Sequence, residues 1–234
     1  MQILEYSELG VRSARINLTS PKSGISVTLF PMVHIGEAEF YREVYGDAFA
    51  HDVALVEGVR SPIAQRVTRS YRWIIGSRRL PGLILQPRSP QAGDVPATII
   101  HADLSGEAFA LVWARVPLWL RGLIYVGAPL MGLWMRAFAT PESLGKRLTM
   151  DDQPSQAEVL SWNPEVAGLE AAILDARDGF LIERLEEVLD TPNQPAKRVA
   201  VVYGAHHVRA VLRALTGRRG YIAHHAQWLT VFHL

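Results

Sequence analysis

Cysteine is absent from this chain of 234 residues. Disulfides, thiolate nucleophiles and sulfur-based zinc sites are therefore excluded, and any metal must be bound by histidine, aspartate or glutamate. The common catalytic and nucleotide motifs are missing too, since the sequence has no G-x-S-x-G, H-E-x-x-H, G-x-x-x-x-G-K-[ST] or G-x-G-x-x-G. These absences remove the commonest hydrolase, protease and nucleotide-enzyme classes. They leave open a site assembled from residues far apart in the chain.

A strong charge imbalance and a leader peptide are also missing. The formal net charge is +1, which gives no argument for a nucleic-acid partner. The first eight residues have neither a basic start nor an apolar core, so we expect a cytoplasmic protein. Apolar residues make up 49% and charged residues 20% of the chain, which is typical of a folded globular protein. We expect a single α/β domain over residues 1–234.

A long uncharged run is lacking even in the most apolar segment, residues 108–139. Its longest uncharged stretch, 122–135, has 14 residues, fewer than the roughly 18–20 that a membrane-spanning helix needs. Pro117 and Pro129 are expected to break or kink a helix there. We therefore predict a helical hairpin, inserted at about 105–140, that packs against the body or a partner. The interrupting charges are Arg115, Arg121 and Arg136.

This apolar segment carries Trp113, Trp119 and Trp134 and is more apolar than a folded core requires. A homodimer interface through residues 108–139 is our first explanation, and a peripheral membrane contact is the second. The second explanation would make the cytoplasmic protein membrane-associated.

Acidic residues are absent from residues 59–93. Such a stretch can bind an acidic substrate or a membrane surface. The plainer alternative is a solvated helix face paired with acidic side chains of residues 151–190. The stretch contains seven arginines: Arg60, Arg66, Arg69, Arg72, Arg78, Arg79 and Arg88.

The remaining pattern predicts an α/β fold with a mixed, largely parallel central sheet flanked by helices. A strand, a helix and a strand within residues 25–58 are typical of a crossover unit with parallel strands. Apolar runs predict strands at 25–33, 53–58, 95–103 and 198–203, and a last strand from residue 220. Helical spacing predicts helices at 37–50, 166–190 and 207–216, and Ser105 is placed to cap another.

Four polar residues end or directly follow these predicted strands: His34, Glu57, Asp103 and His207. The carboxyl ends of parallel strands meet at one edge of a sheet, so we expect these side chains to share a crevice. Two imidazoles with a carboxylate suit a divalent ion such as Zn, Mn or Co. Such an ion lowers the pKa of bound water toward about 7, and a free carboxylate can accept the proton.

Each of these residues also has a structural alternative. A carboxylate directly after Val-Ala-Leu-Val is costly unless paired, and Arg60 or Arg177 would pair Glu57 without any chemistry. Asp103 can begin a turn or cap the next helix. Adjacent His206 and His207 must point in different directions, so one is an alternate for the other. For His51, His224 and His225 we favour structural roles.

At these residues the chain resembles the TraB/PrgY family, which is related to the Tiki metalloproteases and, more remotely, to erythromycin esterase and ChaN-like proteins. The family pattern is G-x-x-H, a strand ending in V-E, a helix with E-R-[DN], and G-A-x-H. The matching segments are Pro31-Met32-Val33-His34-Ile35-Gly36, Val53-Ala54-Leu55-Val56-Glu57-Gly58, Ala176-Arg177-Asp178-Gly179-Phe180-Leu181 and Val201-Val202-Tyr203-Gly204-Ala205-His206-His207, with Gly220-Tyr221 after it.

The resemblance implies a metal site and an arginine that contacts the substrate or an acidic ligand. Arg177 would be that arginine, and Arg60 matches an arginine that often follows the second strand. Pro31 stands where the family has glycine, and residues 59–165 match little, so substrate choice is expected there. The implied metal-site residues are His34, Glu57 and His207.

The first functional hypothesis is a metal-dependent hydrolase, with a peptidase as its first form. Its catalytic residues would be Glu57, Arg177 and Asp103, and its substrate-binding residues Arg60, Arg177 and His206. The second is a non-catalytic module that binds a peptide or a small signal, since the family includes a pheromone-control protein. A third, haem or iron binding like the ChaN relatives, has the least support.

Overall fold

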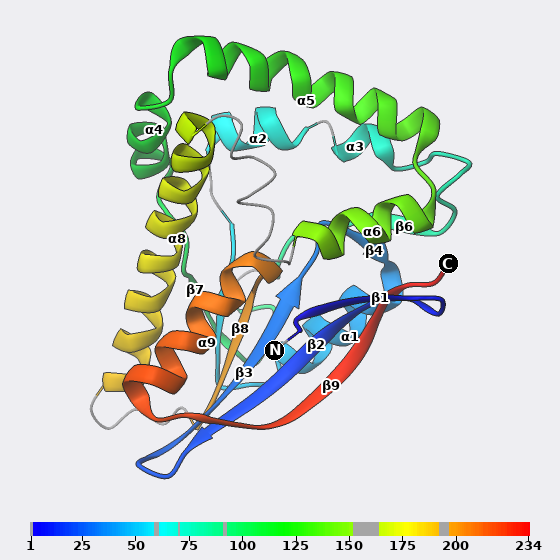
Figure 1. Ribbon diagram of the computed structural model, residues 1–234. Coiled ribbons are helices and arrows are strands. Elements are labelled where there is room, and N and C mark those ends of the chain that lie inside the picture. Colours follow the sequence, from blue (N-terminus) through cyan, green and yellow to red (C-terminus); the bar gives the residue numbers. More distant parts are fainter. Residues whose placement is uncertain (1, 59–60, 70, 91–92, 152–163, 192–196) are drawn as a thin grey trace.

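The fold is known from a computed structural model that describes residues 2–58, 61–69, 71–90, 93–151, 164–191 and 197–234. The predicted architecture is confirmed: a mixed, largely parallel central sheet is flanked by helices (Figure 1). One hydrophobic core extends over the sheet and its helices and includes residues from Ile3 to Phe232.

Four strands form the parallel half of the sheet. They lie in the order β3 (Ser23–Met32), β8 (Arg198–Gly204), β5 (Val53–Val56) and β7 (Thr98–His101), and each neighbouring pair is parallel. β5 and most of β3 and β8 are buried along consecutive residues rather than at alternate ones. Such continuous apolar runs are typical of strands covered on both faces.

The antiparallel half is built around the long strand β2 (Gly10–Ser20). It pairs with β1 (Leu4–Ser7) and β3, and with the C-terminal strand β9 (Ile222–Phe232). A second, two-stranded sheet joins β4 (Ile35–Glu37) to β6 (Leu83–Leu85). β4 begins directly after His34, so this small sheet fixes the backbone beside that histidine.

Helices cover both faces of the central sheet (Figure 1). Helix α1 (Ala38–Ala48) packs on one face through Phe40 and Val44, which are four residues apart and buried. Helix α9 (Ala205–Arg219) packs on β3 and β8, and α8 (Pro164–Asp190) packs against α9. The helices predicted at 37–50, 166–190 and 207–216 are thus present, with shifted ends.

The predicted insertion is helical and lies beyond the sheet. Helix α4 (Gly106–Ala114) begins where expected, since the Ser105 hydroxyl accepts a hydrogen bond from the Ala108 N–H. Pro117 separates α4 from α5 (Leu118–Phe138). Pro129, which we expected to break or kink the segment, lies inside the continuous helix α5.

Helix α5 forms the outer edge of the molecule (Figure 1). Beneath it pack α2 (Pro62–Thr68) and α3 (Tyr71–Ile74). A small second core, which includes Trp113 and Leu120, lies between α2, α4 and α5. Helix α6 (Pro141–Asp151) then returns the chain to β1 and β2.

Among the described residues, α5 is the one helix long and apolar enough to cross a membrane by length and composition. The mean hydropathy of its best 18-residue window is 1.3, and 17% of that window is buried inside the structure. The longest uncharged run underestimates the length of this helix, because α5 accommodates Arg121 and Arg136 near its ends.

The parallel sheet predicts where truncation costs most. Leu55 is fully buried in β5, between β8 and β7. We expect Leu55→Ala to lower the free energy of unfolding by about 2–5 kcal/mol, because it leaves a cavity that close-packed neighbours cannot fill. Leu9→Ala, at a residue that is 71% exposed, should change it by less than about 0.5 kcal/mol. Urea unfolding followed by circular dichroism measures both, and equal losses would contradict this packing.

Candidate active site at the carboxyl ends of the parallel strands

The carboxyl ends of the four parallel strands meet at one edge of the sheet. Met32 of β3 is opposite Gly204 of β8, and Val56 of β5 is opposite both Val202 of β8 and His101 of β7. The residues that follow these positions therefore emerge side by side. They include all four strand-end residues named from the sequence: His34, Glu57, Asp103 and His207.

A buried ion cluster occupies the centre of this edge. The Arg177 guanidinium reaches in from α8, and its Nη2 donates to Glu57 Oε1 at 2.6 Å and to Asp103 Oδ2 at 2.7 Å. Arg177 Nε donates to Asp103 Oδ1 at 3.0 Å. The partner that Glu57 needs is thus Arg177, while Arg60, the other candidate, lies outside the described residues.

The backbone completes the coordination of both carboxylates. The Gly204 N–H donates to Glu57 Oε2 at 2.7 Å, and the Gly58 N–H donates to Asp103 Oδ2 at 3.1 Å. Gly204 caps the N-terminus of α9, where the helix dipole favours a negative charge. A Cβ at this position would lie 3.1 Å from Glu57 Oε2, so glycine permits the close approach.

These contacts set the charge of the cluster. Burial by itself raises the pKa of Glu57, but the positive Arg177 and the nearby His34 and His207 outweigh burial and hold this pKa below its usual range. Burial would lower the pKa of Arg177, but the hydrogen bonds and charges of Asp103 and Glu57 raise it further. Both groups are therefore ionised at neutral pH.

His207 is buried and braced by a carboxylate that the sequence analysis assigned no role. Its Nδ1 lies 2.5 Å from Asp178 Oδ1. Because an ionised carboxylate only accepts hydrogen bonds, Nδ1 is the donor in this contact, and Nε2 points away from Asp178. Asp178 directly follows Arg177 on α8, so one turn of this helix serves both the ion cluster and the histidine. The sequence signal was the Arg-Asp pair itself.

Tyr203 is a second residue missed from the sequence. Its ring makes an edge contact with the His207 ring, with centroids 5.0 Å apart, and the Arg177 guanidinium carbon lies 5.6 Å from its centroid. Burial, and then the negative charge of Asp103, raise the pKa of its hydroxyl. Tyr203 therefore stays neutral, and its ring lies against both the His207 imidazole and the Arg177 guanidinium.

His34 lies at the exposed side of the same edge. Its Nδ1 is 3.3 Å from Gln86 Oε1, and its carbonyl accepts a hydrogen bond from the Gln86 N–H at 2.9 Å. Gln86 Nε2 donates to the Tyr45 hydroxyl, which directs Oε1 toward the imidazole. The ring of Tyr71, from α3, lies 5.5 Å from the His34 ring.

Two histidines at this edge offer ring nitrogens of the kind that bind divalent metals. Both His34 and His207 are braced through Nδ1, and neither Nε2 is hydrogen-bonded to a described residue. Metal-binding histidines commonly have a hydrogen-bond partner on the other ring nitrogen. In the described part of the chain, however, no three histidine or acidic side chains are grouped as a ready metal site. Both Glu57 oxygens already accept hydrogen bonds.

The other histidines lie elsewhere. His206 is exposed on the first turn of α9, and His224 and His225 are exposed on β9. His51 is buried and structural, since its ring nitrogens lie 2.9 Å from the Asp47 carbonyl oxygen and 3.0 Å from the Thr28 hydroxyl.

Comparison of the chain with protein-family models, curated proteins and solved structures finds no match.

The ion cluster predicts a large cost for removing its cation. Arg177→Met leaves two carboxylates buried without a counter-charge, so we expect a loss of about 3–5 kcal/mol in the free energy of unfolding. The control is Arg219→Met, which removes a surface pair with Asp190 and should cost about 0–1 kcal/mol. Chemical denaturation measures both variants. A cost for Arg177→Met no larger than that of the control would contradict the cluster.

Proposed function

We propose that the protein is a metal-dependent hydrolase, acting on peptides or related amides, with its site at the carboxyl ends of β3, β8, β5 and β7. One observation carries this proposal: an ionised, buried Glu57 lies at the same sheet edge as two histidines that are each braced through Nδ1. The resemblance to the TraB/PrgY family supports the same reading.

The residues that would hold the metal are His34 and His207, through Nε2, together with Glu57. The chemistry that such a metal would supply is a water whose pKa is lowered to about 7. Gln86 and Asp178 are the outer partners that fix the two imidazole rings.

The side chains at the strand ends would orient the substrate and stabilise the charges that develop during hydrolysis. The water oxygen adds to the scissile carbonyl carbon, the C–N bond breaks, and the proton removed from water passes to the departing amine. In its alternative role as a base rather than a metal ligand, Glu57 is the ionised group that would accept this proton. Arg177 Nη1 makes no hydrogen bond to a described residue, which leaves it for the developing oxyanion or a substrate carboxylate.

A second candidate is a binding module that performs no chemistry. The hydrogen bonds within the ion cluster favour this candidate, because both Glu57 oxygens and two Arg177 nitrogens already take part in them. Such a cluster would serve as a rigid floor for a bound peptide or small signal. The two candidates differ in turnover and not in ligand class.

Metal content tests the proposal directly. Wild-type protein loaded with Zn²⁺, Mn²⁺ or Co²⁺ and then desalted should retain about one ion per chain by elemental analysis. His34→Ala should bind the same ion more than about tenfold more weakly, because it loses a ligand. His224→Ala, which removes an exposed histidine on β9, is the matched control and should bind as the wild type does.

Equal metal content in the wild type and His34→Ala would overturn the metal site. If the metal is bound, a peptide-library cleavage assay with the loaded protein separates the two candidates. Cleavage that His34→Ala abolishes supports the hydrolase. Absence of cleavage with every one of the three metals, across neutral and mildly alkaline pH, favours the binding module.

The brace of His207 gives a second prediction. Asp178→Asn replaces the carboxylate with a neutral amide that can donate as well as accept, so it no longer fixes the orientation of the imidazole, and we expect metal affinity and hydrolysis to fall by about 10–100-fold. Asp175→Asn, the same change at an exposed position of α8, should leave both unchanged. Isothermal titration with the metal gives the affinity. A loss of thermal stability in Asp178→Asn with unchanged metal affinity would show that Asp178 acts only in packing.

A further inference from the structure

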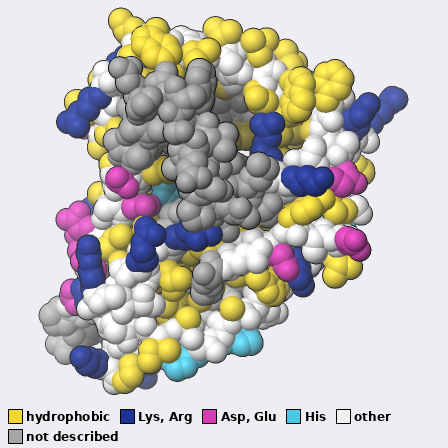
Figure 2. Space-filling model, viewed as in Figure 1, with side chains coloured by type: hydrophobic (Ala, Val, Ile, Leu, Met, Phe, Trp, Pro, Cys, Tyr) yellow, Lys and Arg dark blue, Asp and Glu magenta, His cyan; other side chains and the backbone are white. Residues whose placement is uncertain are grey.

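The outward face of α5 is an uninterrupted apolar stripe. Its large side chains recur every three or four residues, which places them on one side of the helix. Figure 2 shows hydrophobic side chains gathered along this edge of the molecule. The exposed fractions are 53% for Trp119, 60% for Leu123, 61% for Val126, 60% for Leu130 and 52% for Leu133. Apolar surface of this extent requires an occupant.

The two arginines of α5 do not interrupt this stripe. The Arg121 guanidinium donates to the carbonyl oxygens of Val116 and Ala114. That of Arg136 donates to the carbonyl oxygens of Trp73, at 2.9 Å, and Ile75, at 3.3 Å. Both charges are therefore turned back onto the body, and the outward face is left entirely apolar.

Residues 66–79, which lie on and beside helices α2 and α3 under α5, include a group of exposed cations. None of these arginines forms an ion pair with an acidic side chain in the described part of the chain. The plainer alternative of pairing with residues 151–190 is therefore not met by the acids described there; residues 152–163 lie outside the description. The exposed arginines are Arg66, Arg69, Arg72, Arg78 and Arg79.

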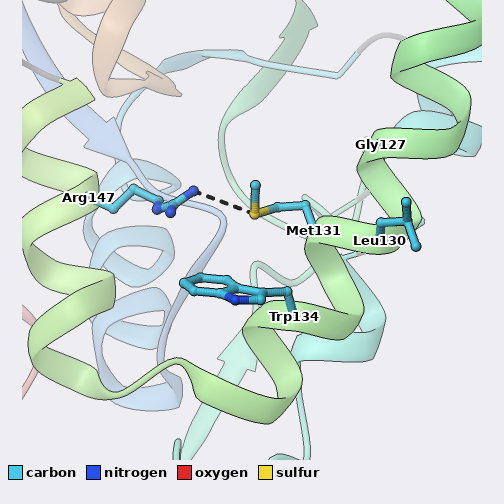
Figure 3. A pocket seen from close by; sticks show the side chains of 5 residues that line it. All are labelled: Gly127, Leu130, Met131, Trp134 and Arg147. Atoms are coloured by element: carbon cyan, nitrogen blue, oxygen red, sulfur yellow. Dashed lines mark hydrogen bonds between the residues drawn. The ribbon is translucent and has the colours of Figure 1, made fainter.

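A hollow of about 440 Å³ borders the stripe on the side of α6 (Figure 3). Gly127, Leu130, Met131 and Trp134 line it from α5. Arg147 of α6 closes its edge, with its guanidinium carbon 5.8 Å from the Trp134 ring centroid. The hollow thus joins apolar walls to one cation, a combination that suits an acyl chain beside an anionic headgroup.

We propose that the outward face of α5, flanked by the arginines of α2 and α3, docks on the surface of an anionic lipid bilayer. Over 21 residues α5 is about 31 Å long and would lie in the plane of the interface, with its apolar face about 5–10 Å deep. Trp119 and Trp134 near its two ends are residues favoured at that depth. The exposed arginines of residues 66–79 are complementary to anionic headgroups.

The same charges argue against a second copy as the occupant. A two-fold dimer places the same surface patch of both subunits in contact, so it would bring two sets of unpaired arginines together. A membrane-spanning placement is disfavoured by packing, because Leu120, Gly132 and Met135 of α5 are buried against the rest of the protein.

Vesicle flotation tests this surface. Full-length protein should float with vesicles of phosphatidylcholine containing one-third phosphatidylglycerol, and binding should fall as salt is raised. The double variant Leu123→Asp/Leu130→Asp should bind these vesicles more than about tenfold more weakly, because it places charge on the inserted face. Leu9→Asp, the same change at a residue that is 71% exposed in the distant β1–β2 turn, should bind as the wild type does.

The arginines are tested separately. Arg72→Ser/Arg78→Ser should lower the binding to phosphatidylglycerol vesicles by about 30-fold, at about 1 kcal/mol per arginine. Equal thermal unfolding of all variants confirms that the fold is intact. The proposal is overturned if the wild type ignores the vesicles, binds pure phosphatidylcholine equally well, or loses no binding on Leu123→Asp/Leu130→Asp. It is also overturned if lipid-free light scattering finds a dimer that this double variant dissociates.

Discussion

Arg177 is the constraint on which the candidate site depends. Glu57 and Asp103 follow neighbouring strands and are held close together by the backbone, and each is largely buried. Two buried carboxylates cannot both stay ionised without a cation between them. One guanidinium supplies that charge through three hydrogen bonds and thereby ties α8 to the ends of β5 and β7. An arginine suits this position better than a lysine because its planar fork contacts both carboxylates at once.

The position of α8 then fixes the rest of the site. With Arg177 in place, the next residue, Asp178, meets His207 at the start of α9, and Tyr203 fills the space between these two pairs. Gly204 contributes its N–H and its lack of a side chain to the same arrangement. The charged centre and the braced histidine are therefore consequences of one helix docking. His34 depends on a different element, the small β4–β6 sheet that positions Gln86.

The strand ends were predictable from the sequence. In a parallel sheet, a continuous apolar run that stops at a polar residue indicates the carboxyl end of a buried strand. The partner of Glu57 was not predictable, since the sequence allowed Arg60 and Arg177 equally. Only the packing of α8 against the strand ends selects Arg177. Gln86 belongs to no recognisable sequence pattern, and the only sequence signal for Asp178 was its place next to Arg177. For α5, composition gave the apolar character but not the exposure: a buried core helix and an exposed one have similar residues, and Pro129 gave no sign that its neighbours would support a continuous helix.

The two proposals meet at α3. Tyr71 of this helix contacts the His34 ring, and Trp73, two residues on, accepts a hydrogen bond from Arg136 of α5 through its carbonyl oxygen. Helix α3 therefore links α5 to the edge of the sheet where the parallel strands end (Figure 1). A ligand held near His34 would lie on one side of α3, and α5, on the other side of α3, would meet the bilayer. Under the two proposals together, membrane docking through α5 would hold the candidate site near the bilayer without contributing a catalytic group.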